Sequence, residues 1–141
     1  MVESQDVGLR FSKWPLHVTL LPWFAAPNIE KVMALCEKTA GECESFSVSV
    51  KERAYLGPNN KLAVMLLDKN AKIMGLHQKL LSKVASKDWS LQGRWTGAQY
   101  RPHVTRHGGK DAEGEVTINA LYIVERLGQG YRKVVGKVLI A

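Results

Sequence analysis

The tripeptide His-Val-Thr occurs twice in this chain, in PLHVTLL at residues 15–21 and in RPHVTRH at residues 101–107. The 141 residues contain four histidines, so half of them stand in the same short sequence. Apolar and polar residues alternate around both copies, which is the pattern of a half-buried β-strand. The sequence therefore predicts a strand at 16–21 and another at 102–108.

Outward from these two copies, the chain alternates between short strands and two helices. Asn28 and Asn70 are suitable N-caps for helices at 27–41 and 70–86. Further strands are predicted at 44–52, 62–68, 116–127 and 131–141, with a turn at 56–61 and a long loop at 87–100. This order predicts an α+β fold with mixed or antiparallel sheets backed by two helices. No linker interrupts it, and we expect a single domain over residues 1–141.

The charge of the chain points to an anionic partner. Lys and Arg number 20 against 13 Asp and Glu, giving a formal net charge of +7. Such a surplus favours binding to polyanions, nucleic acid above all. A basic surface without a particular ligand is the alternative.

The cysteines and the hydropathy indicate the compartment. Cys36 and Cys43 are too few for a disulfide framework and lack metal-site spacing. The sequence has no stretch that resembles a signal peptide or a membrane-spanning helix. We therefore expect a cytoplasmic protein that does not associate with a membrane, and we expect it to be a monomer.

The two tripeptides are candidate halves of one active site. Residues two apart on a strand point to the same side, so His17 lies beside Thr19, and His103 beside Thr105. The alternative is two half-exposed strands whose polar faces merely include these residues. Two imidazoles and two hydroxyls suit a phosphodiester, because histidine can act as acid or base near neutral pH and hydroxyls can donate to phosphate oxygens. Neither tripeptide contains a carboxylate, and we expect no metal and no cofactor.

The sequences HVTL at 17–20 and HVTR at 103–106 resemble the paired His-x-Thr motifs of the two-histidine (2H) phosphoesterase superfamily. Within it, the chain is most similar to the 2′-5′ RNA ligase-like proteins, or RNA 2′,3′-cyclic phosphodiesterases. The resemblance extends to the order of elements and to the C-terminal ALYIVERLGQGYRKVVGKVLI. It implies two pseudo-symmetric lobes with antiparallel sheets that flank a central cleft, with the two helices on the outside.

The resemblance also implies an activity, the hydrolysis of 2′,3′-cyclic phosphates to 2′-phosphates. His17 would protonate the leaving 3′-oxygen, His103 would activate water, and Thr19 and Thr105 would hold the phosphate. The expected partners are RNA ends or small nucleotides with a 2′,3′-cyclic phosphate. Position 106 is Arg where the family has an apolar residue.

Other residues near the motifs are candidates for substrate binding. Arg101 and Arg106 could add charge to a phosphate site, although solvated basic residues are the alternative for both. His107 shares the parity of His103 and could line the rim of the cleft, although a plain surface histidine is the alternative that we favour. His77 reads as a boundary residue of the core. Aromatic side chains near the motifs could stack on a base; the candidates are Trp23, Phe24, Trp95 and Tyr100. Packing in the core or in a loop is the alternative for each, and we expect one of the four to stack on a base.

Other functions use the same residues. A nuclease that degrades cyclic or 2′-5′-linked oligonucleotide messengers needs the same histidines and threonines. A non-catalytic RNA-binding module would keep the cleft without turnover. RNA ligation is a third and weaker alternative, because the sequence shows no nucleotide-activation motif; any ligation would be the reversal of a phosphodiester cleavage.

Overall fold

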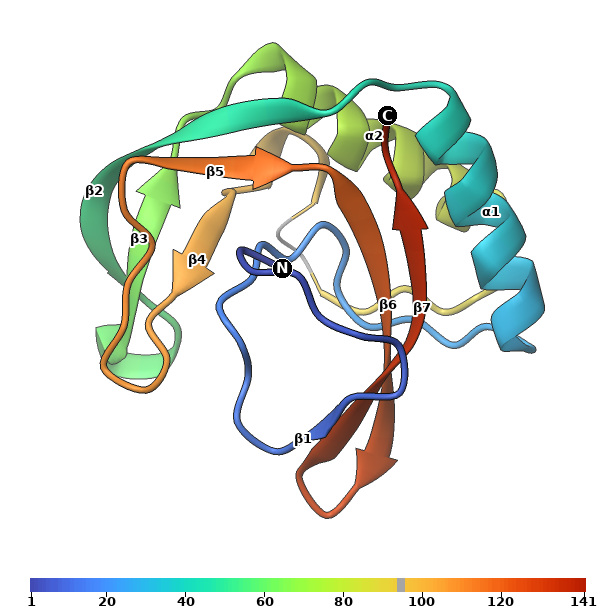
Figure 1. Cartoon of the computed structure of the whole chain (residues 1–141), viewed down its shortest axis with the longest axis horizontal. Coiled ribbons are helices and arrows are strands. Elements are labelled where there is room, and N and C mark those ends of the chain that lie inside the picture. The colour runs from blue at the N-terminus through green and yellow to red at the C-terminus, as the bar shows by residue number, and fades with distance from the viewer. Residues whose placement is uncertain (94–95) are drawn as a thin grey trace.

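Two antiparallel sheets and two helices form the structure, a computed structural model that describes residues 1–93 and 96–141. The α+β class is confirmed (Figure 1). The smaller sheet has the order β1 (Arg10–Phe11), β7 (Tyr131–Leu139) and β6 (Ala120–Gly128). The larger sheet has the order β4 (His103–Thr105), β3 (Leu62–Leu67), β2 (Phe46–Leu56) and β5 (Glu115–Ile118).

The two helices begin where the sequence predicts. The side chain of Asn28 accepts a hydrogen bond from the Lys31 amide (3.0 Å) at the start of α1, Ile29–Gly41. Asn70 does the same for the Ile73 amide (2.9 Å) at the start of α2, Ala71–Ala85. Short 3₁₀ turns occupy Pro58–Asn60 and Gly97–Gln99.

The long strand predicted at 116–127 is in fact two strands in different sheets. β5 pairs with β2, whereas β6 pairs with β7, and the ladder breaks between them at Asn119. The Asn119 carbonyl accepts a hydrogen bond from the Ile140 amide (2.9 Å), which satisfies the backbone where the chain passes from one sheet to the other. Both strands bury apolar side chains, so the apolar pattern continues on either side of Asn119. The sequence pattern therefore does not reveal the change of sheet.

One hydrophobic cluster includes residues of both sheets and both helices. Val48 of β2, Ile73 of α2 and Val104 of β4 are completely buried within it. Leu121 at the start of β6 and Cys36 of α1 join the same cluster. In the view of Figure 1 the N-terminus and the first part of the segment that leads to α1 lie between β4 and the β6–β7 hairpin, and the rest of this segment passes behind β6 and β7. The first His-Val-Thr copy lies on this segment.

Within the described residues, no helix has the length and apolar character needed to cross a membrane.

Candidate active site

The first motif lies on an extended segment, and the prediction of a strand at 16–21 is wrong. Val18 alone makes a bridge, to Val104 of the second motif. Other backbone carbonyls of the segment are taken up individually: those of Leu16, Thr19 and Leu20 accept from the Val2 amide (2.8 Å), the Tyr100 hydroxyl (2.7 Å) and His77 Nδ1 (2.7 Å). Single hydrogen bonds from the Val2 backbone and from two side chains replace the ladder that would have made a strand.

The second motif is strand β4, which is shorter than the predicted 102–108. β4 pairs with β3, so that His103 stands opposite Leu66 and Thr105 opposite Val64. On its other side, Val104 bridges to Val18. The middle residues of the two motifs therefore meet across an antiparallel bridge, so that segments far apart in the sequence lie side by side at the motifs. His103 is near enough to His17 to affect its pKa.

The two motif histidines are oriented in the same way. His17 Nδ1 donates to the carbonyl of Pro15 (2.8 Å), and His103 Nδ1 donates to the carbonyl of Arg101 (2.7 Å). A carbonyl oxygen can only accept, so the Nδ1 atoms carry hydrogen. In the neutral ring Nε2 then has the free lone pair, and in the charged ring it carries a proton. Each histidine thus offers one nitrogen for proton transfer.

Burial makes His17 a weak base. Desolvation lowers its pKa from 6.5 to about 4, against the opposing effect of the hydrogen bond to Pro15. Electrostatic interactions with the amino terminus, His107 and His103 also lower the pKa of His17. His17 is therefore neutral at pH 7 in the free protein. Desolvation also lowers the pKa of His107.

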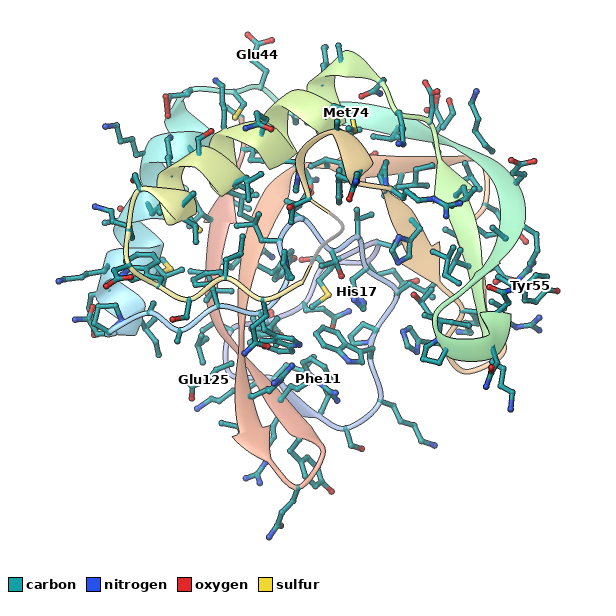
Figure 2. All side chains as sticks on the ribbon, turned by 180° about the vertical axis from the view of Figure 1, so that it is seen from behind. Phe11, His17, Glu44, Tyr55, Met74 and Glu125 are labelled. Carbon is teal, nitrogen blue, oxygen red and sulfur yellow. The ribbon has the colours of Figure 1, made fainter. Side chains whose placement is uncertain are left out.

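Two further rings adjoin His17. The ring of Trp14 stacks on it at 4.2 Å between centroids, and the ring of His107 lies 5.9 Å away with an interplanar angle of 16°. The sequence predicts that His107 lies on the same face as His103, because alternate residues of a strand point to the same side. Trp14 was missed, and the signal that could have found it is an aromatic residue three positions before the motif histidine. His17 is half-buried, and in the view of Figure 2 it lies between the β6–β7 hairpin and the larger sheet.

The threonines of the two motifs differ in exposure: Thr19 is exposed and Thr105 is half-buried. Two imidazoles and two hydroxyls can together bind a phosphate group and move protons to and from it. Among the described residues, no group of three or more His, Cys, Asp or Glu side chains is arranged to hold a metal ion.

Tyr100 has a structural role in place of the predicted contact with a base. The residue is only 5% exposed, its ring stacks on that of His77 at 3.9 Å, and its hydroxyl donates to the Thr19 carbonyl. No open ring face is left for a nucleobase. His77 is not at the boundary of the core but inside it, 1% exposed, and its Nε2 accepts from the Gly97 amide (2.9 Å). Through their hydrogen bonds to the Thr19 and Leu20 carbonyls, Tyr100 and His77 fix the position of the first motif.

The remaining candidates lie in different surroundings. Phe24 is half-buried, stacks on Trp89 at 5.9 Å and packs against the core. Trp23 is half-buried and lies under the guanidinium of Arg126. Trp95 falls outside the described residues.

The two arginines near the second motif point to different places. Arg101 lines a shallow hollow of about 330 Å³ with Lys51 and Asp68, and neither motif histidine lines this hollow. Arg106 is exposed, and its Nη2 donates to the Gly109 carbonyl (3.3 Å).

A family model described as the 2′-5′ RNA ligase superfamily matches residues 5–121. The match covers most of the chain and both His-Val-Thr motifs, so the chain belongs to this superfamily, which is that of the 2H phosphoesterases. The resemblance found in the sequence is confirmed. A search of curated proteins gave no match. The superfamily acts on phosphodiesters and implies RNA or nucleotide substrates.

Proposed function

We propose that this protein is a metal-independent phosphodiesterase that hydrolyses 2′,3′-cyclic phosphates, on RNA ends or nucleotides, to 2′-phosphates. One observation carries the proposal: the Val18–Val104 bridge joins the two motifs, and both histidines have Nδ1 bound to the carbonyl two residues upstream. Two Nε2 atoms from different parts of the chain are then available to one phosphate. Cys36 and Cys43 are free thiols, which suits the reducing cytoplasm that we propose as its location.

The proposed reaction needs one base and one acid. His103 Nε2 takes a proton from water as the water oxygen attacks phosphorus. The bond from phosphorus to the 3′-oxygen breaks, and His17 gives its Nε2 proton to that oxygen. The product is a 2′-phosphate with a free 3′-hydroxyl. Thr19 and Thr105 donate hydrogen bonds to the non-bridging oxygens, where negative charge accumulates in the transition state.

The acid role of His17 depends on the substrate. At pH 7 the free protein has a neutral His17, because burial lowers its pKa to about 4. A bound phosphate brings negative charge next to the ring, which favours the charged imidazolium and raises its pKa. His17 then takes up the proton that it later donates.

Replacing either histidine tests the proposal. We expect His17→Ala and His103→Ala each to lower kcat/KM for 2′,3′-cyclic nucleotides by about 10²–10⁴-fold, in the presence of a chelator. Thr105→Val tests the role of the motif hydroxyl and should reduce activity. Its control is Thr117→Val, which changes an exposed threonine of β5 and should leave activity unchanged. Full activity in either histidine variant, with an intact circular dichroism spectrum, would refute the proposal.

The same variants assign the acid and the base. A substrate with a good leaving group, such as bis(p-nitrophenyl) phosphate, needs no proton donor. His17→Ala should therefore retain a larger fraction of its activity on this ester than on the cyclic phosphate, whereas His103→Ala should lose activity on both. The reverse pattern would assign the proton donor to His103.

A substrate panel separates the related functions. Cyclic dinucleotides and 2′-5′ oligomers tested beside the 2′,3′-cyclic nucleotides would reveal a messenger nuclease by a higher kcat/KM. RNA binding with no cleavage of any substrate would indicate a binding module.

A further inference from the structure

Two arginines on the smaller sheet face each other without an acidic partner. Arg126 of β6 stands directly opposite Arg132 of β7 in the antiparallel register. Like charges in this position destabilise a sheet. The three ion pairs found among the described residues all lie elsewhere. The arginine pair therefore carries a repulsion that a bound anion would relieve.

Each guanidinium lies over an indole ring. The Cζ of Arg126 is 4.2 Å from the ring centre of Trp23, and the Cζ of Arg132 is 5.1 Å from that of Trp14. Contact with the ring holds a guanidinium in place and leaves N–H donors for an acceptor. Within the described part of the chain, Arg132 Nε is buried and has no hydrogen-bond partner. Arg132 Nη1 donates to the Gly130 carbonyl (3.2 Å), so among the described residues Nε is the buried donor of this guanidinium that lacks an acceptor. A buried donor without a partner is unfavourable, and an anionic oxygen brought to this side chain would lower that cost.

The arginine pair is next to His17. Trp14 links the two, because its ring stacks on His17 and lies under the guanidinium of Arg132. The ring centre of Trp14 is 6.4 Å from that of Trp23, the ring under Arg126. Phe11, opposite Arg132 in the β1–β7 register, packs edge-on against Trp14 at 4.9 Å. In Figure 2, Phe11 lies on the same side of the β6–β7 hairpin as His17, and Glu125 projects from the other side.

We propose that the arginine pair, Arg126 and Arg132, binds an internucleotide phosphate of a single-stranded RNA whose 3′ end lies at His17. Only one indole separates His17 from Arg132, so a strand that ends at the histidine would bring its next phosphate to the pair. The fork of a guanidinium matches two phosphate oxygens. The preferred substrate is then an RNA end rather than a mononucleotide. The identity of the end group rests on the proposed function, but binding of the strand does not.

A binding experiment tests the arginine pair without any hydrolysis. The probe is a fluorescein-labelled uridine pentanucleotide with a 3′-phosphate, titrated with the full chain and followed by anisotropy. The variants are Arg126→Gln, Arg132→Gln and the double variant. The matched control is Arg10→Gln: the guanidinium of Arg10 also lies over a ring, that of Tyr131 at 5.0 Å. Arg10 precedes Phe11 in β1 and therefore points to the opposite face of the sheet.

We expect the double variant to raise the Kd at least tenfold and Arg10→Gln to change it less than twofold. Each lost phosphate contact should also flatten the dependence of log K on log salt concentration by about 0.7. In hydrolysis, the ratio of kcat/KM for a cyclic-phosphate oligonucleotide to that for a cyclic mononucleotide should fall at least tenfold. If the double variant does not fold, Arg126→Gln alone carries the test, because Arg126 is exposed.

An unchanged Kd in the double variant, or an equal loss in Arg10→Gln, would overturn the inference. The outcomes for the two proposals are separate. Strand binding that requires the arginine pair, in a protein that opens no cyclic phosphate, would support this inference and refute the proposed function. If the protein hydrolyses cyclic phosphates but the arginine substitutions leave strand binding unchanged, the proposed function is supported and this inference is refuted.

Discussion

His17 is a histidine that the fold keeps neutral. Its folded pKa of about 4 lies below the 6.5 of an unfolded chain, so the unfolded state binds more protons between these two values. The stabilisation from a neutral His17 is therefore complete above about pH 6.5 and is lost as the pH falls towards 4. The position that suits the ring to proton transfer thus makes the protein sensitive to acid.

We expect His17→Asn to reduce this sensitivity. Asparagine keeps a donor for the Pro15 carbonyl but does not titrate. The free energy of unfolding measured in urea should fall between pH 7 and 4.5 by less in the variant than in the wild type, with a difference on the order of 2 kcal/mol. Thr19→Val, a neighbouring change without a titratable group, should keep the wild-type pH dependence. If the free energy of unfolding depends on pH in the same way in the wild type and in His17→Asn, the burial that lowers the pKa of His17 is contradicted.

Helix α1 packs closely on strand β7, and the contact depends on a glycine. A Cβ added to Gly136 would lie 2.5 Å from the Sδ of Met33 on α1 and 3.0 Å from Cδ1 of Ile123. Ile123 is opposite Gly136 in the β6–β7 register, next to an irregularity of the ladder. A glycine inside a strand commonly marks such a close approach.

Alanine at this glycine should separate helix and sheet. We expect Gly136→Ala to lower the free energy of unfolding by about 1–2 kcal/mol, because the Met33 side chain must move. The control is Gly75→Ala in α2, where nothing lies within 4 Å of the added Cβ. That change should stabilise the protein by about 0.5–1 kcal/mol through helix propensity. Thermal denaturation of the two variants gives both values, and a stable Gly136→Ala would show that the gap tolerates a methyl group.

Over the whole molecule, both sheets share one core, and we propose that residues 1–141 unfold as one domain. The hydrophobic cluster includes Val48 and Val104 of the larger sheet together with Leu121 at the start of β6. The tryptophans report on different regions: Trp14 lies against the smaller sheet, and Trp89 is buried in the shared core.

Unfolding in urea should therefore give one transition. Tryptophan fluorescence and far-ultraviolet circular dichroism should have the same midpoint, as for a two-state domain of this size. Two separated transitions would mean that the smaller sheet unfolds independently, which would contradict the single domain.

Local sequence determined most of the elements and the identity of the motifs. The caps at Asn28 and Asn70 are local properties of the sequence, and both helices agree with the prediction to within a few residues. The repeated His-Val-Thr also identified the superfamily, because its residue types and spacing carry the chemistry.

Only the tertiary structure decided which partners each segment has. Residues 16–21 look like a strand, but the backbone there binds His77 and Tyr100, which no local pattern reveals. The break at Asn119 has the same origin, since it depends on which sheet receives each half. The pairing of Arg126 with Arg132, and their position beside Trp14, follow from the strand register. Contacts between distant residues are set by packing of the whole chain, whereas hydropathy periodicity reports only on neighbours.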